Sequence, residues 1–247
     1  MSALRRVAVL LGAAVLLALA GTAGAGAAEA AASRPVWAHR GGTGSGHVEN
    51  TRPTFRAAAG QGQLRWETDV RFTRTDYPVL LHDADLGKFG CPELAIRSVS
   101  VTRARECVAD DGQTLSTLSQ FTHDLTAYGA RAWVELKTVP PADQWSRLER
   151  RLQPVQAEVV VESFLPSALE AASGRGYTTA LLTTTPVARG DLPHGTDWYA
   201  PKVTQVTGTK ARAMHAVGVQ VAVWTPSRDE WSTVPGAVDE LISNDLP

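Results

Sequence analysis

The stretch LRWETDVRFTRTDYPVLLHD, residues 64–83, does most to decide how this chain is expected to fold. It contains two short apolar runs, residues 64–70 and residues 78–82, which are separated by only a few residues. A parallel crossover needs a dozen or more residues, so the second run must return antiparallel, as a hairpin. The stretch therefore predicts one strand of a larger sheet and a hairpin that leaves it.

The rest of the chain repeats one pattern, in which a short apolar run is usually followed by a segment with helical spacing. Eight runs are predicted to be strands: 36–39, 64–70, 132–136, 159–164, 179–182, 198–203, 219–224 and 238–243. Helices are predicted over residues 54–59, 115–128, 144–152, 167–172 and 210–216. Strands that alternate with helices are typical of a parallel sheet. Eight strands in one domain predict an α/β fold, a (β/α)8 TIM barrel with a short hairpin excursion after the second strand.

The N-terminal residues 1–30 are predicted to be a secretory signal peptide. Arg5 and Arg6 precede an apolar run over residues 7–20, and small residues with A-x-A spacing follow. An uncleaved anchor is the alternative, although the run is short for a membrane span. We therefore expect a secreted, extracellular protein without a stable membrane anchor, whose barrel domain covers residues 33–247.

Charge and cysteine content narrow the class of protein further. Lys and Arg number 24 against 25 Asp and Glu, with no basic stripe among aromatic residues, so nucleic acid is not an expected partner. Cys91 and Cys107 are expected to form a disulfide after export, with buried free thiols as the alternative. Both lie in residues 84–112, which look irregular and are interpreted as a rim or lid beside a site.

Acidic residues are spaced two apart on two neighbouring predicted strands. Glu67 and Asp69 face one side of their strand, and Glu135 and Lys137 repeat this spacing on the next barrel strand. If this side is the barrel interior, the carboxylates repel one another unless a cation lies between them. Exterior positions remain the alternative, because the opposite faces of the two strands also carry apolar residues, namely Trp66, Val70, Val134 and Leu136. Oxygen ligands favour one divalent cation, Ca²⁺ or Mg²⁺.

Two histidines lie at predicted strand ends, His39 before Arg40 and His82 before Asp83. Histidine can donate or accept a proton near neutral pH, and arginine can bind a phosphate through two hydrogen bonds. Together with the acidic residues, this set is what a metal-assisted phosphoester enzyme needs. The remaining histidines show no partner pattern and are expected on the surface or on helices: His47, His123, His194 and His215.

In their order along the chain, these motifs resemble the glycerophosphodiester phosphodiesterase family. The matching segments are His39-Arg40-Gly41, Glu49-Asn50-Thr51, Glu67-Thr68-Asp69-Val70, Pro78-Val79, His82-Asp83, Glu135-Leu136-Lys137, Glu162-Ser163-Phe164 and Val223-Trp224-Thr225. The chain departs from the family pattern at Val48, where proline is usual, and at residues 86–89, which lack the usual Arg-Thr-Thr.

The resemblance implies a role for each matching residue. Glu67, Asp69 and Glu135 would hold the cation, and His39 and His82 would form the acid/base pair. Phosphate contacts are implied for Arg40 and Lys137, and pocket-lining positions for Phe164 and Trp224.

The expected function is hydrolysis of a small-molecule or lipid-derived glycerophosphodiester to an alcohol and glycerol phosphate, by a monomeric enzyme. A sphingomyelinase D-like phospholipase acting on lysophospholipid or sphingolipid head groups is the alternative enzyme, because a small disulfide loop near the site suits that group as well. A secreted, inactive binding module on the same barrel is the third possibility, since a fold alone does not guarantee activity.

Overall fold

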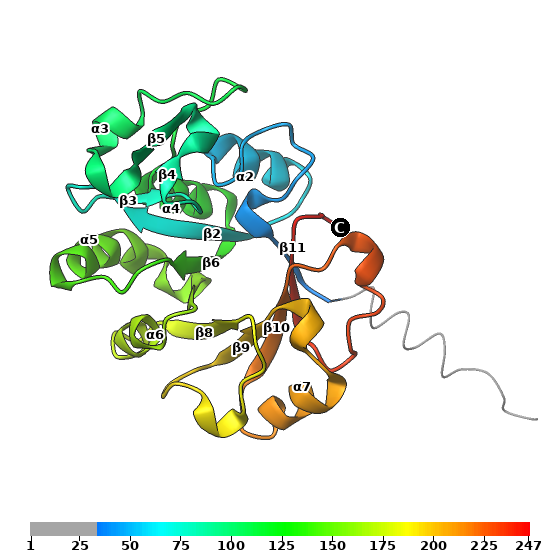
Figure 1. The fold of residues 1–247 in the computed structure, drawn as a ribbon. Coiled ribbons are helices and arrows are strands. Elements are labelled where there is room, and N and C mark those ends of the chain that lie inside the picture. Colours follow the sequence, from blue (N-terminus) through cyan, green and yellow to red (C-terminus); the bar gives the residue numbers. More distant parts are fainter. Residues whose placement is uncertain (1–33) are drawn as a thin grey trace, which may run out of the picture.

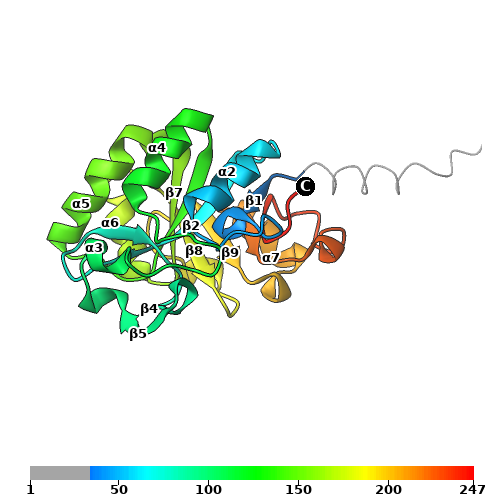
Figure 2. The ribbon, with the colours of Figure 1, turned by 90° about the horizontal axis from the view of Figure 1, so that it is seen from above.

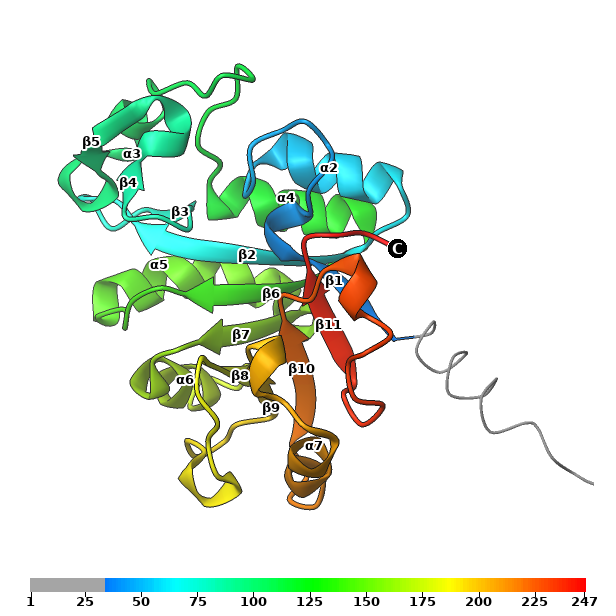
Figure 3. The ribbon, with the colours of Figure 1, turned by 45° about the vertical axis from the view of Figure 1, so that its right-hand side comes forward.

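The computed structural model describes residues 34–247, and in it eight parallel strands close into a barrel (Figure 1). The strands are β1 (Val36–Ala38), β2 (Arg65–Phe72), β6 (Arg131–Leu136), β7 (Val159–Ser163), β8 (Thr178–Thr183), β9 (Trp198–Pro201), β10 (Gln220–Trp224) and β11 (Glu240–Ser243). The barrel closes because β1 pairs with both β11 and β2. Figure 3 shows β11 between β1 and β10.

The hairpin predicted after the second strand is also present. β3 (Pro78–Leu80) pairs antiparallel with β2, with Val70 opposite Leu80. The predicted barrel and its excursion are therefore confirmed. The signal peptide prediction, residues 1–30, lies outside the described residues. Within residues 34–247, no helix has the length and apolar character needed to cross a membrane.

Helices cover the outside of the barrel. They are α2 (Arg52–Gly60), α4 (Leu118–Tyr128), α5 (Ala142–Leu152), α6 (Pro166–Ser173) and α7 (Gly208–His215). The helix predicted from residue 115 begins three residues later, because the Thr117 side chain accepts a hydrogen bond from the Gln120 backbone and caps the helix there. The connections after β8 and β10 contain only short 3-10 turns, Arg189–Asp191 and Arg228–Glu230.

The packing of β2 shows which of its residues point into the barrel. Trp66 packs outward against Phe55 of α2 and Phe121 of α4, with ring centroids 5.4 and 5.9 Å away. Side chains alternate along a strand, so Glu67 and Asp69 point inward. The exterior alternative is thereby excluded.

Tryptophans fill one end of the barrel interior. The Trp133 ring lies 5.8 Å from that of Trp37 and 5.3 Å from that of Trp198, centroid to centroid. Small side chains, among them Ala180 and Ala200, complete this cluster. The interior is thus packed with apolar groups at one end and carries the charged groups at the other.

The connection expected to be irregular is instead a small packed lobe. It contains β4 (Asp85–Leu86), β5 (Cys91–Ala95) and the short helix α3 (Val101–Ala104), with its own apolar cluster around Phe89. The predicted disulfide between Cys91 and Cys107 is present, with Cα atoms 5.9 Å apart. In Figure 2 this lobe lies on the side of the barrel away from α2 and α4.

Candidate active site

A cavity of about 190 Å³ opens among the carboxyl ends of the barrel strands, where barrel enzymes carry their active sites. One wall is charged and the other is mostly apolar. Its lining residues are His39, Arg40, Glu67, His82, Glu135, Lys137, Glu162, Phe164, Leu182, Trp224 and Ile242. The cavity thus brings together all the predicted site residues except Asp69, which lies buried just behind its wall.

Three buried carboxylates form the centre of the charged wall. Carboxylate oxygens of Glu67, Asp69 and Glu135 all lie within 4.8 Å of one another. Strand pairing explains this proximity, because Asp69 of β2 is registered with Glu135 of β6. Burial, reinforced by the charge of Asp69, raises the pKa of Glu135 to about 7 and that of Glu67 well above its ordinary value.

Two cations offset part of this negative charge. Lys137 Nζ lies 2.8 Å from Asp69 Oδ1 and 2.6 Å from Glu135 Oε2. Arg40 Nε lies 3.1 Å from Asp69 Oδ2, and the Arg40 backbone N–H donates to Glu67. Burial alone would raise the pKa of Asp69, but Lys137 and Arg40 outweigh it and hold this pKa well below its ordinary value.

The strand end at residues 39–42 adopts an unusual backbone that directs Arg40 into the site. Arg40 has a φ of 54° and Gly41 a φ of 92°, both in the left-handed region. A Cβ at Gly41 would lie 2.6 Å from Thr54 Cγ2, so only glycine lets α2 approach this closely.

The two histidines have different surroundings. His39 Nδ1 lies 2.6 Å from Asn244 Oδ1, and burial followed by the Arg40 charge lowers the His39 pKa to about 4. His82 is more exposed, and its Nδ1 lies 2.8 Å from Asp83 Oδ1. Each imidazole therefore has one nitrogen held by a neighbour, while both rings line the cavity.

Sequence reasoning quoted the Glu49-Asn50-Thr51 motif without giving it a role. Asn50 is buried and donates to Asp69 Oδ2 over 2.7 Å, while its Oδ1 accepts from Thr68 and from the Asp69 backbone. Glu49 accepts from Arg40 at 3.0 Å and from Lys88 of the lobe at 2.5 Å. These two residues orient the acidic centre and its arginine, and the motif itself was the signal that could have identified them.

Glu162 on β7 is a further site residue, which the sequence motifs did not single out. Its side chain is 1 % exposed and lines the cavity. Burial, reinforced by the charges of Glu67 and Glu135, raises its pKa well above the ordinary value. The two-residue spacing from Phe164, a predicted pocket residue, could have indicated it, because both side chains must face inward.

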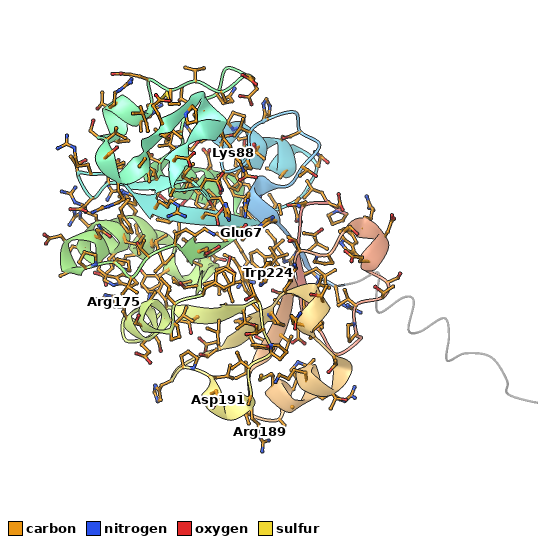
Figure 4. All side chains as sticks on the ribbon, in the orientation of Figure 1. Glu67, Lys88, Arg175, Arg189, Asp191 and Trp224 are labelled. Atoms are coloured by element: carbon orange, nitrogen blue, oxygen red, sulfur yellow. A yellow bond between two sulfur atoms is a disulfide. The ribbon has the colours of Figure 1, made fainter. Side chains whose placement is uncertain are left out.

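Aromatic side chains form the other wall. The Phe164 and Trp224 rings meet edge to face with centroids 5.5 Å apart, and Trp224 Nε1 donates to the Ala200 carbonyl. In Figure 4, Glu67 and Trp224 both lie near the middle of the barrel, and Lys88 lies on the lobe side of Glu67. The cavity is thus bounded by charged and aromatic groups on facing sides.

Outside the cavity, three of the other histidines contact a carboxylate. His47 lies 3.6 Å from Asp111, His123 3.3 Å from Asp124 and His215 2.8 Å from Asp239. All four of the remaining histidines are exposed, as expected for surface or helix residues, and the sequence pattern did not show these carboxylate partners. None of the three lines the cavity.

The acidic centre fits a divalent cation. Four buried carboxyl groups, those of Glu67, Asp69, Glu135 and Glu162, share the site with two partly buried cations, Arg40 and Lys137. Such an excess of buried negative charge is unfavourable without another positive charge. The trio Glu67, Asp69 and Glu135 supplies the hard oxygen ligands that Ca²⁺ and Mg²⁺ prefer.

Comparison with known proteins shows which family the charged wall of the cavity resembles. Residues 39–137 match the model of the glycerophosphoryl diester phosphodiesterase family. Over this segment the chain is similar to that family. The matched segment runs from the first histidine to the last lysine of the charged wall, so it contains both histidines, all three acidic residues and both cations. The family's name gives the reaction class, hydrolysis of a phosphodiester.

Solved structures resemble the whole barrel of this protein. One is an Oleispira antarctica phosphodiesterase in complex with the product sn-glycerol-3-phosphate, at 21% identity and a TM-score of 0.74, covering 87% of this chain and 95% of the other. The Thermotoga maritima glycerophosphodiester phosphodiesterase has 21% identity, a TM-score of 0.69 and coverages of 85% and 93%. One from Parabacteroides distasonis has 16% identity, a TM-score of 0.74 and coverages of 85% and 92%. At these identities the likenesses establish the fold. A comparison with curated proteins finds no match.

Proposed function

We propose that this protein hydrolyses glycerophosphodiesters to an alcohol and glycerol phosphate, with a divalent cation and the pair His39 and His82. The observation that carries the proposal is a single cavity lined by both histidines, by Arg40 and Lys137 and by the buried acidic centre. A phosphodiester needs positive charge at its oxygens and proton transfer at the attacking and leaving oxygens, and this cavity provides groups for both.

In the proposed reaction, water attacks phosphorus and the bond from phosphorus to the leaving alcohol oxygen breaks. One histidine accepts a proton from the attacking water, and the other donates a proton to the leaving oxygen. Arg40 and Lys137 stabilise the negative charge that builds on the phosphate. Ca²⁺ or Mg²⁺, held by Glu67, Asp69 and Glu135, would supply further positive charge to the phosphate oxygens.

A second candidate is cleavage of lysophospholipid head groups. Phe164 lines the cavity and is also 39% exposed, and the adjacent Leu165 is 36% exposed. Exposed apolar side chains at the mouth of a cavity are suited to contact an acyl chain. The small-molecule reaction is favoured because the cavity itself is small and largely polar on one wall.

Phosphorus NMR distinguishes the two candidates. The protein would be incubated with glycerophosphocholine or lysophosphatidylcholine, in Ca²⁺, Mg²⁺ or EDTA. Release of glycerol phosphate from the first substrate only with a cation supports the proposed hydrolysis. Turnover of the lipid alone, especially to a cyclic phosphate, supports the phospholipase. A folded protein that acts on neither contradicts both.

We also propose that the protein is exported. The basic start at Arg5 and Arg6, the apolar run and the A-x-A spacing support this proposal. Fractionation of an expressing cell, followed by N-terminal sequencing of the exported protein, tests it. A protein retained in the cell at full length contradicts it.

A further inference from the structure

The carboxyl group of Glu162 has an unusual position for a buried charged side chain. Its Oε2 atom is buried and has no hydrogen-bond partner within residues 34–247. Buried polar groups in folded proteins nearly always have a partner, because leaving one unpaired is unfavourable. Glu162 also lines the cavity, so its carboxyl group belongs to the cavity wall.

The neighbouring strands offer Glu162 no donor. On β6 it is registered with Glu135, whose carboxylate is an acceptor. On β8 it is registered with Ala180, which carries only a methyl group. The sheet around Glu162 therefore leaves the carboxyl group without a partner on either side.

Neither cation of the cavity forms a hydrogen bond with Glu162. Lys137 contacts Asp69 and Glu135, and the Arg40 side chain contacts Asp69 and Glu49. The remaining wall is formed by apolar side chains, among them Phe164 and Trp224. The two histidines that line the cavity form no hydrogen bond with Glu162 either, so a donor on a molecule that enters the cavity would complete its carboxyl group.

The size and walls of the cavity indicate what this molecule is. A volume of about 190 Å³ suits a small polar group such as a three-carbon polyol arm. The carbon atoms would pack on Phe164 and Trp224, and a hydroxyl would reach Glu162. A quaternary ammonium has no donor and would leave Oε2 unpaired, whereas a hydroxyl can both donate and accept.

We infer that Glu162 is the specificity-determining residue that recognises a hydroxyl group on the glycerol arm of the substrate, opposite the aromatic wall of Phe164 and Trp224. This inference rests on the proposed diesterase function and adds to it the residue that reads the glycerol. A site built to bond a hydroxyl discriminates strongly against the analogue that lacks it, because its buried polar group is then left unpaired.

Two substrates and two variants test the inference. The substrates are glycerophosphocholine and n-propyl phosphocholine, which has the same three carbons without the hydroxyls. Glu162→Leu removes both oxygens with little change in size, and Glu162→Gln keeps a group that bonds a hydroxyl. Glu170→Gln, an exposed change on α6, is the matched control.

The wild-type protein is expected to prefer glycerophosphocholine in kcat/KM by on the order of 10²-fold. Glu162→Leu should lose most of this preference, whereas Glu162→Gln should keep it within a few-fold, as should the control. Glu162→Leu should also melt at a higher temperature than wild type in EDTA, because it removes an unpaired buried polar atom. If Glu162→Leu loses the preference for glycerophosphocholine and also melts at a higher temperature, the loss cannot come from damage to the fold.

Other outcomes overturn the inference. Equal losses by Glu162→Leu with both substrates mean that the residue does not read the hydroxyl. A fall in Ca²⁺ affinity in both variants, measured by calorimetry, makes Glu162 a metal ligand. No change in either variant means that it only contacts water.

A failure of the proposed function can be distinguished from a failure of this inference. If wild type hydrolyses neither substrate, calorimetric binding of glycerol 3-phosphate and of n-propyl phosphate in Ca²⁺ still tests the site. Glu162→Leu should then weaken binding of the first ligand selectively. Equal binding of both ligands to wild type overturns the inference.

Discussion

At the residue scale, the proposed chemistry depends most directly on His82. Its ring is partly exposed, lines the cavity and has one nitrogen held by Asp83 at 2.8 Å. We predict that His82→Ala lowers kcat for glycerophosphocholine by about 10²- to 10⁴-fold, the usual contribution of a general acid or base. The melting temperature should hardly change, because the side chain is not in the core.

The control for His82→Ala is His194→Ala, an exposed histidine that does not line the cavity. Steady-state kinetics and thermal unfolding of both variants provide the measurements. A fully active His82→Ala protein would remove this residue from the mechanism.

Asn50 is the residue that orients the acidic centre, so its loss is predicted to affect both stability and the cation. Asn50→Gly isolates the side chain, because glycine readily adopts the φ of 58° found here. The Asp69 carboxylate and its backbone N–H would lose their partner. We expect a decrease of about 2 kcal/mol in the free energy of unfolding and cation binding weakened at least about 10-fold.

Urea unfolding and calorimetric titration with Ca²⁺ measure the two effects of Asn50→Gly. If the variant unfolds more easily but binds the cation as wild type does, Asn50 only stabilises the fold. Unchanged unfolding would contradict the predicted cost of leaving Asp69 unpaired.

At the element scale, one buried carboxylate joins the helices α2 and α4. Asp124 of α4 is 1% exposed and accepts hydrogen bonds from Arg52 and Arg56 of α2. Burial would raise the pKa of Asp124, but the two arginines outweigh it and lower this pKa from 3.8 to about 2. Because the folded-state pKa is the lower one, the ionised form stabilises the folded state.

We predict that Asp124→Asn lowers the free energy of unfolding by on the order of 2 kcal/mol at neutral pH. The difference from wild type should be fully present above pH 4 and should shrink as the pH falls towards 2, where Asp124 becomes protonated in the folded state too. Urea unfolding at a series of pH values measures it. Asp191→Asn, an exposed change in the loop after β8, is the control (Figure 4). A difference that does not depend on pH would contradict this electrostatic account.

The strands and helices were largely predictable from the sequence. The alternation of apolar runs with helical spacing predicted all eight barrel strands, and the short gap before Pro78 required the hairpin. The sequence pattern could not show which face of β2 points into the barrel. A strand that is buried on both faces carries apolar residues at odd and at even positions alike. Only the packing of Trp66 against the helix layer decided it.

The sequence predicted only part of the site, because some of its residues are recognisable only from their neighbours in the fold. Charged residues within otherwise apolar strands, such as Glu67 and Glu135, stand out in a sequence. Asn50 and Glu162 do not stand out in this way, because their importance depends on neighbours that the fold brings to them. For Asn50 these neighbours lie across a loop, and for Glu162 they lie across the sheet. The lobe at residues 84–112 was read as irregular because its strands are too short to show alternation.

At the scale of the whole molecule, cation binding should be linked to the stability of the barrel. The acidic trio comes from β2 and β6, which pair along their length, so repulsion among the carboxylates opposes the closed barrel. A ligand that binds only the folded state stabilises it by about 2.7 kcal/mol at 100 times its Kd. We therefore predict that saturating Ca²⁺ or Mg²⁺ raises the melting temperature by several degrees relative to EDTA.

The variant Glu67→Gln tests this prediction, because its melting temperature relative to wild type should change sign between EDTA and Ca²⁺. It removes one buried negative charge, so in EDTA it should melt at a higher temperature than wild type. It also removes one ligand, so in Ca²⁺ the order should reverse, with wild type the more stable protein. Thermal unfolding of both proteins under both conditions measures the reversal. A wild-type melting temperature that no divalent cation changes would show that the trio is not a cation site, and the negative charge of the cavity would then have to be offset by the substrate or by protonation.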